Sequence, residues 1–156
     1  VWRALEEAYE AGKIRSIGVS NFLEKDVESL LETAKVVPHV NQLLVHVGNT
    51  PSDLLEYCAL KKVLVQAYSP IAHGAILGNP TVAEVAERYG VSIPQLCIRY
   101  TLQLGTQSLP KTGNPEHMRD NAQVDFVISN EDMAALRDLD DRDYGEYTAF
   151  PVYSGK

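Results

Sequence analysis

The sequence is poor in cysteine, and its two cysteines are not arranged for a disulfide framework or a metal site. Cys58 and Cys97 are the only cysteines among 156 residues. They lie far apart within helix-like segments and lack the paired spacing of zinc-binding or redox motifs. We therefore interpret both as buried thiols of an intracellular protein. The histidines His39, His46 and His73 show no ligand spacing either, so the sequence predicts no metal site.

The sequence also shows no long apolar run, no basic stripe and no signal-peptide pattern. No stretch is long and apolar enough to span a bilayer, and the N-terminus shows no signal-peptide pattern. The formal net charge is −7 at pH 7 and no arginine-rich block offsets it, which argues against nucleic acid as a partner. We expect a cytoplasmic protein with no nucleic-acid or membrane partner. One local basic pocket for a phosphate is still compatible with this charge.

Two common nucleotide-binding signatures are missing as well. No Gly-x-Gly-x-x-Gly follows a predicted strand, so a dinucleotide-binding doubly wound fold would lack its phosphate loop. Lys111-Thr112 is not preceded by the glycine spacing of a P-loop.

What the sequence does have is a regular alternation of strand-like and helix-like segments, over a length that suits one domain. Strands are predicted over 14–19, 39–45, 63–68 and 106–109, and a Gly-containing loop over 72–79. Helices are predicted over 2–11, around 27–34, over 54–61, over 80–89, around 93–104, from 114 onward and over 129–139. Such alternation is typical of right-handed βαβ units in a parallel sheet.

The predicted fold class is therefore α/β, of the parallel (β/α) barrel type. About four strand–helix units, half of a (β/α)8 barrel, would be followed by one extra C-terminal helix. We assign residues 1–139 to this half-barrel and 140–156 to a loop-like tail. Polar residues stand at the C-terminal ends of the predicted strands, where such barrels keep their sites.

A polar motif over residues 109–121 follows the last predicted strand. Its Asn-Pro-Glu triplet (114–116) is a good helix start, because Asn caps, Pro suits the first helical position and Glu suits the positive end of the dipole. Backbone amides at such a start bind anions. With Lys111 and Thr112 beside them, the motif suggests a phosphate grip. An ordinary strand-to-helix turn with a solvated lysine is the alternative.

Four segments, taken in order, resemble the aldo-keto reductase family. They are 12–22, 41–46, 66–70 and 109–121, which resemble the fifth, sixth, seventh and eighth barrel strands with their following turns. The resemblance covers nearly the whole chain, but only the second half of the family's fold. It implies a (β/α)8 barrel that reduces aldehydes and ketones with NADPH.

The resemblance also implies which residues would hold the nicotinamide end of that cofactor. Ser20, Asn21 and Gln42 would bond the carboxamide, and Tyr68 would stack on the ring. Each has a plainer alternative. Ser20 and Asn21 could be a helix cap, Tyr68 a core aromatic, and Gln42 an amide that lines a barrel.

The rest of the implied cofactor site lies further along the chain. Ser69, Ile71 and His73 would lie along the pyrophosphate and the loop that covers it. Lys111 and Thr112 would hold the adenosine 2′-phosphate.

The residues implied on the adenine side are Asp120 and Asn121, together with His117. Many members have an arginine at His117, and histidine lacks its guanidinium fork. We therefore expect NADP(H), with NAD(H) as an alternative. Leu44 and Val47 stand where many members have a glutamate and a proline. The resemblance therefore does not predict the wall of the substrate pocket.

The family's catalytic residues have no counterpart in this chain. The resemblance implies that a tyrosine acid and its aspartate, lysine and histidine partners come from the first half of the barrel. We assign no catalytic residue, and interpret the lone His46 as structural rather than as an acid–base group. The tail aromatics Tyr147, Phe150 and Tyr153 either pin the tail or line a substrate pocket.

We expect the NADP(H)-binding half of an aldo-keto reductase-type oxidoreductase that is not competent alone. The alternative is a non-catalytic nucleotide-binding or self-associating half-barrel. Four strands taken from a closed barrel expose two edges, and the chain opens at Val1 with neither a starter Met nor a cap. We therefore expect self-association or a missing N-terminal half, with a small aldehyde or ketone as substrate once the barrel is complete.

Overall fold

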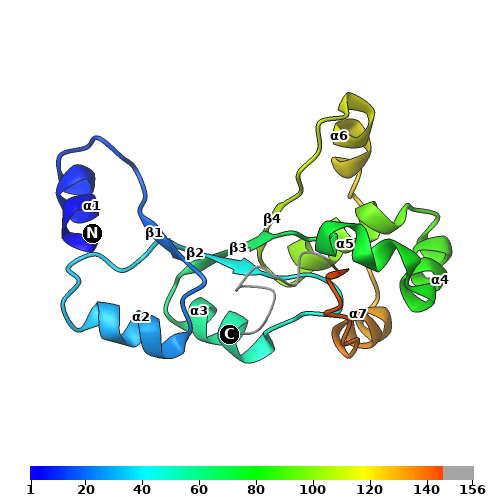
Figure 1. Cartoon of the computed structure of the whole chain (residues 1–156), viewed down its shortest axis with the longest axis horizontal. Coiled ribbons are helices and arrows are strands. Elements are labelled where there is room, and N and C mark those ends of the chain that lie inside the picture. Colours follow the sequence, from blue (N-terminus) through cyan, green and yellow to red (C-terminus); the bar gives the residue numbers. More distant parts are fainter. Residues whose placement is uncertain (146–156) are drawn as a thin grey trace. The chain divides into compact units, whose positions relative to one another are not determined.

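The fold of this protein was obtained as a computed structural model, which describes residues 1–145. Figure 1 shows the elements in chain order. The helices are α1 (Trp2–Glu10), α2 (Glu24–Leu31), α3 (Ser52–Leu60), α4 (Pro80–Tyr89), α5 (Ile93–Gln103), α6 (Pro115–Asn121) and α7 (Asn130–Arg137). The strands are β1 (Gly18–Ser20), β2 (Val40–Leu44), β3 (Leu64–Tyr68) and β4 (Gln107–Leu109). The predicted alternation of strands and helices is confirmed element by element.

The strands form one four-stranded sheet in the order β1-β2-β3-β4. Strands β1 and β2 pair in parallel, with Gly18 opposite Val40 and Ser20 opposite Gln42. Neighbouring strands in sequence are therefore neighbours in the sheet, with one α-helix between β1 and β2 and between β2 and β3, and with α4 and α5 between β3 and β4. This is the arrangement of a partial (β/α) barrel.

By packing, the residues divide into two compact units. Unit 1 comprises Val1–Leu43 and Pro51–Gln66, and unit 2 comprises Leu44–Thr50 and Ala67–Lys156, of which residues up to 145 are described. In unit 1, α2 and α3 lie on the same side of β1 and β2 (Figure 1). Val27 of α2, Cys58 of α3 and Asn41 of β2 are fully buried there.

Glycine is required at the point where β1 approaches β2. A Cβ atom built on Gly18 would lie 2.6 Å from the carbonyl oxygen of Val40 and 3.0 Å from its Cβ. Because ordinary contacts are longer, any larger residue would push the strands apart. Gly18 thus sets the close spacing that brings Ser20 beside Gln42.

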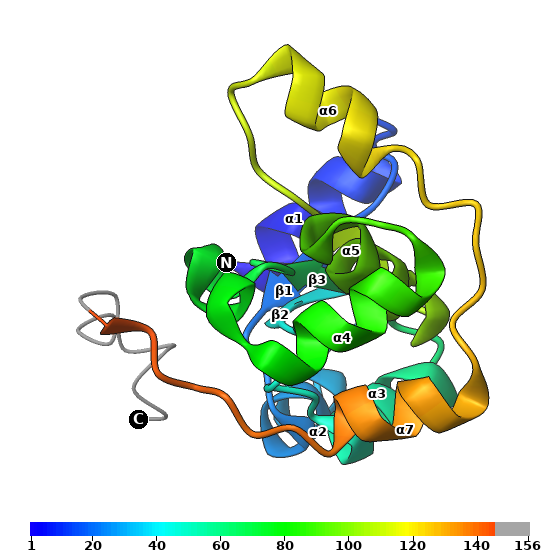
Figure 2. The same cartoon turned by 90° about the vertical axis from the view of Figure 1, so that its right-hand side faces the viewer.

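Unit 2 is built around the pair α4 and α5, which lie side by side, with α7 packed against them (Figure 2). Its buried core joins apolar residues of these three helices, namely Val82, Val85, Ala86, Leu96, Cys97, Tyr100, Met133 and Leu136. Each helix begins at a side-chain cap from Asn79, Ser92 or Ser129. Gly90 ends α4 with φ of 64°, a left-handed value that glycine adopts without strain.

Two details differ from the sequence prediction. The segment expected to be a loop over 72–79 contains 3₁₀ turns (Ala72–Gly78), interrupted where His73 and Gly74 have φ of 54° and 92°. The first strand is shorter than the predicted 14–19, because the N–H of Ile17 bonds the Nδ1 atom of His39 at 3.1 Å rather than a backbone carbonyl. The tail residues Tyr147, Phe150 and Tyr153 lie outside the described residues.

Candidate cofactor site

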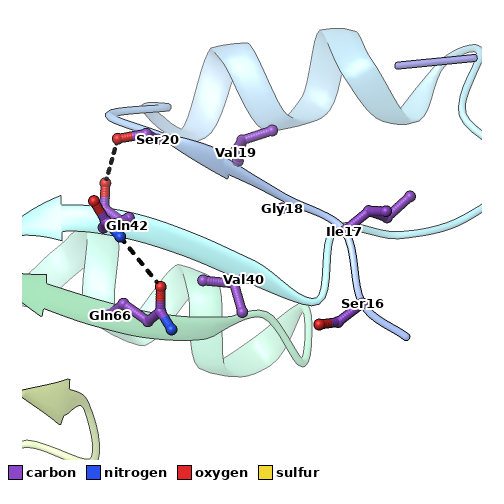
Figure 3. A pocket seen from close by; sticks show the side chains of 8 residues that line it. All are labelled: Ser16, Ile17, Gly18, Val19, Ser20, Val40, Gln42 and Gln66. Carbon is purple, nitrogen blue, oxygen red and sulfur yellow. Dashed lines mark hydrogen bonds between the residues drawn. The ribbon is translucent and has the colours of Figure 1, made fainter. Parts of the chain in front are cut away.

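Eight of the twelve predicted site residues line two cavities, one in each unit, and Asn21, Tyr68, Ser69 and His73 line neither. In unit 1, Ser20 and Gln42 line a cavity of about 380 Å³ (Figure 3). The structure adds Gln66 to this lining, which the sequence analysis did not assign. Gln66 stands in the otherwise apolar run of β3, and the alternation along that strand was the signal that could have found it. Its neighbours Val65 and Ala67 are buried, so Gln66 faces the opposite side.

Hydrogen bonds tie β1, β2 and β3 together at this cavity. The Ser20 hydroxyl donates to the backbone carbonyl of Gln42 at 3.2 Å, and the N–H of Asn21 donates to the same oxygen at 2.9 Å. The Gln42 side-chain amide donates from Nε2 to Oε1 of Gln66 at 3.3 Å (Figure 3). Three polar side chains on three strands thus share one face of the sheet.

Ser20 and Asn21 do not cap the helix that follows them. The cap position of α2 is Leu23, whose N–H donates to the carboxylate of Asp26 at 2.9 Å. The capping alternative for these two residues is therefore wrong. Asn21 has φ of 56°, in the left-handed region that asparagine tolerates better than most residues, and it turns the chain sharply at the end of β1.

In unit 2, a cavity of about 350 Å³ gathers six of the predicted cofactor residues. They come from three separate segments and are Ile71, Lys111, Thr112, His117, Asp120 and Asn121. Leu77, Ser92 and Pro94 complete the lining and were not assigned from the sequence. They come from the 3₁₀ segment and the start of α5, which carry no polar signature of their own.

The loop before α6 holds its own conformation. Asn114 accepts from the N–H of Glu116 at 2.9 Å, as predicted for a cap, and the Thr112 hydroxyl accepts from the N–H of Asn114 at 3.1 Å. Two amides at this helix start are therefore already bonded within the loop. An anion in this cavity would depend on the exposed Lys111 ammonium and on the Thr112 hydroxyl hydrogen.

The acidic residue of this cavity is held from α5. Gln95 donates from Nε2 to the backbone carbonyl of Asp120 at 3.0 Å and to that of Gln123 at 3.3 Å. These two bonds fix the end of α6 against α5. The cavity therefore combines one cation, one carboxylate and several neutral groups on a braced frame.

Three other predicted residues are not among those that line the unit 2 cavity. Tyr68 is half-buried at the end of β3, so it is not a fully buried core aromatic. The Ser69 hydroxyl lies 3.1 Å from Nε2 of His73. Ser69 and His73 both have positive φ, 51° and 54°, so this short segment turns tightly after the strand.

His46 has the surroundings of a structural histidine. It is fully buried, with Nδ1 2.6 Å from the carbonyl of Val47 and Nε2 3.0 Å from the hydroxyl of Tyr144. Burial lowers the pKa of His46, and His73 lowers it further. The charge of Asp141 acts in the opposite direction and raises this pKa. Since both ring nitrogens have partners, an acid–base role for this side chain is not supported.

The cysteines are buried, as predicted. Burial raises the pKa of Cys97 to about 12, so its thiol stays protonated at neutral pH. Within residues 1–145 no group of three or more histidine, cysteine, aspartate or glutamate side chains could hold a metal ion. In the same residues no helix has both the length and the apolar character needed to cross a membrane.

The fold is that of a partial (β/α) barrel, and comparison with known proteins gives the family. The sequence profile of the aldo/keto reductase family matches residues 1–141. The chain belongs to this family of oxidoreductases.

Individual relatives agree with this assignment. The chain is 41% identical over 142 residues to an uncharacterized oxidoreductase of Schizosaccharomyces pombe, covering 90% of this chain and 52% of that protein. It is 40% identical over 133 residues to glyoxal reductase of Bacillus subtilis, covering 85% and 48%. The chain thus spans about half the length of the curated relatives it matches.

Solved structures show the same partial match. An aldo-keto reductase, AKR2E5, complexed with NADPH, superposes with a TM-score of 0.83 at 34% identity, over 90% of this chain and 46% of that one. MGS-M4, an aldo-keto reductase from a deep-sea metagenome library, gives a TM-score of 0.85 at 36% identity, over 88% and 52%.

Proposed function

We propose that this chain supplies the NADP(H)-binding residues of an aldo-keto reductase that converts a small aldehyde or ketone to an alcohol. The observation that carries this proposal is the unit 2 cavity. Ile71, expected along the pyrophosphate and its covering loop, lies some forty positions before the residues of 111–121 expected at the adenosine end, and all of them line one space. NADPH-complexed relatives of similar fold support the choice of cofactor.

The lining of the unit 1 cavity suits a nicotinamide carboxamide. That group is uncharged, with an NH₂ that donates and a carbonyl that accepts. Ser20 and Gln42 present a hydroxyl and an amide to the cavity, and the other lining residues carry no charge. These side chains would fix the amide and thereby choose which face of the ring presents its hydride.

The lining of the unit 2 cavity suits the adenosine end. Lys111 and Thr112 would hold a 2′-phosphate by charge and hydrogen bond, while Asp120 and Asn121 offer partners for polar groups of the adenine side. His117 would donate or stack but lacks the guanidinium fork of an arginine. We therefore propose NADP(H) as the preferred cofactor and NAD(H) as a weaker ligand.

The bound cofactor would supply the hydride, and this chain would hold the nicotinamide ring in place. A carbonyl also needs a proton donor beside its oxygen. We propose that this group comes from the remainder of a closed barrel, so that the 156-residue chain alone binds nucleotide without turning over substrate.

A titration with NADPH, followed by cofactor fluorescence, tests this function. We expect saturable binding that weakens about five- to tenfold in Lys111→Ala, as loss of one charge-assisted contact predicts. Binding of NADH should weaken less than twofold in the same variant, because NADH lacks the 2′-phosphate. Lys25→Ala, which removes a lysine of α2 in unit 1, is the matched control. A folded chain that binds neither nucleotide would contradict the proposal.

A second candidate, a self-associating half-barrel, is favoured by a specific feature of the sheet. Leu64, the first residue of β3, is an apolar side chain, yet it is 45% exposed. A sheet with open edges and an exposed leucine can be covered by a second copy or by another polypeptide. Light scattering coupled to sizing separates the outcomes, since a monomer at micromolar concentration excludes self-association. Leu64→Gln should shift a dimer toward monomer.

A further inference from the structure

We propose that Gln66 is a positioning residue that sets the polarity of the Gln42 amide, so that the unit 1 cavity selects a carboxamide and rejects the corresponding carboxylate. This inference rests on the proposed function and deepens it. It assigns a role to a residue that the sequence analysis did not single out for the site, and it predicts which pyridine nucleotides the cavity takes.

The amide of the Gln42 side chain has two chemically different ends, an oxygen that accepts hydrogen bonds and a nitrogen that donates them. An isolated glutamine amide rotates between two orientations that exchange its oxygen and its nitrogen. Here Nε2 donates to Oε1 of Gln66 at 3.3 Å, and the Gln42 side-chain oxygen points away from Gln66 (Figure 3). Gln66 therefore holds the amide so that Oε1 is the end available to a ligand. That end accepts hydrogen bonds and cannot donate them.

Ser20 adds a second acceptor to the same face. Its hydroxyl hydrogen is committed to the backbone carbonyl of Gln42 at 3.2 Å. The oxygen lone pairs remain for a donor that approaches from the cavity. Two acceptors on neighbouring strands match the NH₂ of a carboxamide, which has two hydrogens to give. They oppose a carboxylate, which has none.

The absence of charge in the cavity lining also favours a carboxamide over a carboxylate. Its lining consists of serine, glycine, glutamine and aliphatic residues, and none of them is lysine, arginine or histidine. A carboxylate placed there would be partly desolvated without a cation or a sufficient set of donors, which is unfavourable. The neutral amide places its NH₂ against the two acceptors and brings no net charge to be desolvated. The cavity would thus distinguish two ligands that differ by a single group.

Three probes separate the contributions of the two cavities in the full chain. They are NADP⁺, its nicotinic-acid analogue with a carboxylate on the pyridine ring, and 2′,5′-ADP, which has no pyridine ring. We expect wild type to bind NADP⁺ at least tenfold more tightly than the acid analogue. Gln66→Met, of similar length but unable to accept from Gln42, should reduce this ratio about fivefold or more. Binding of 2′,5′-ADP should stay within twofold.

Rescue by a conservative variant distinguishes positioning from packing. Gln66→Glu keeps an acceptor facing Gln42, so the amide-to-acid ratio should stay at or above that of wild type. Gln123→Met makes the same chemical change at an exposed side chain that does not line the unit 1 cavity, and should leave the ratio unchanged. Melting temperatures of all variants check that each is folded.

The outcomes are distinct. Equal affinity for NADP⁺ and the acid analogue, with tight 2′,5′-ADP binding, would overturn the role of this cavity and leave the proposed cofactor intact. A Gln66→Glu variant that loses selectivity as Gln66→Met does would overturn the role of Gln66. Failure of the folded chain to bind any probe would overturn both proposals.

Discussion

The substitution Gly18→Ala tests how closely β1 is held to β2, and through that spacing the geometry of the unit 1 cavity. The added methyl would lie 2.6 Å from the carbonyl oxygen of Val40, where ordinary contacts begin at 3.4 Å. Relieving the overlap needs a displacement of about 0.8 Å, because the other contact, to Cβ of Val40, is also short at 3.0 Å. A shift of that size breaks the 3.2 Å bond from Ser20 to the Gln42 carbonyl.

Overpacking of this kind costs about 1–3 kcal/mol. Alanine recovers roughly 0.4–1 kcal/mol of this by restricting the unfolded chain. We therefore expect a net loss of about 1–2 kcal/mol and a fall in Tm of about 3–6 °C. Urea denaturation followed by the fluorescence of Trp2, the single tryptophan of the chain, measures the effect in unit 1.

Gly78→Ala is the matched control. No heavy atom lies within 4 Å of a Cβ built there, and its backbone needs no left-handed conformation. Far-UV circular dichroism should show a stability within about 0.5 kcal/mol of wild type. A Gly18→Ala variant that equals this control would refute the close approach of β1 and β2.

Three further perturbations have expected outcomes. Stability of unit 2 should fall as the pH drops below about 6.5, the ordinary pKa of histidine. Burial lowers the pKa of His46 in the folded chain, so on acidification the unfolded chain protonates this side chain first. Urea titrations at stepped pH should show this loss of stability in wild type and a smaller loss in His46→Gln. Asp132→Asn should cost about 2–3 kcal/mol in thermal unfolding, since the carboxylate accepts from both Arg88 and Tyr89 and is itself nearly buried. Gly48→Ala should loosen the segment after α7, whose backbone lies 2.8 Å from the built Cβ, and hydrogen exchange should show faster opening there.

The parts of the fold that the sequence predicts well are those with a local physical cause. Asn79, Ser92 and Ser129 mark helix starts because their side chains accept from backbone amides two or three residues ahead. Gly90 marks a helix end because it reaches a left-handed φ without strain. Such signals depend on a few neighbouring residues, so they are readable without any knowledge of the tertiary fold.

The parts that escaped prediction depend on contacts distant in sequence. The first strand is shorter than predicted because the N–H of Ile17 donates to the side chain of His39, 22 residues away. The 3₁₀ turns over Ala72–Gly78 contain a buried Ile76, and a glycine-containing stretch gives no sign that its apolar residues are packed. Gln66 was missed for the opposite reason. Its local pattern is readable, because a polar residue interrupts an apolar strand, but the resemblance implies roles for Tyr68 and Ser69 and none for Gln66.

The register of β2 affects both the stability of the fold and the chemistry of the unit 1 cavity. Successive residues of a strand face opposite sides, so a slip by one position would exchange Asn41 and Gln42. Asn41 is fully buried and bonds both backbone groups of Phe22, at 2.8 Å to the carbonyl and 3.4 Å from the N–H. A slipped strand would turn Asn41 away from these two groups and bury the longer Gln42 side chain in its place, at a cost of about 1–3 kcal/mol for each buried polar group left unsatisfied. The buried asparagine therefore holds Gln42 on the cavity side, where its amide meets Gln66.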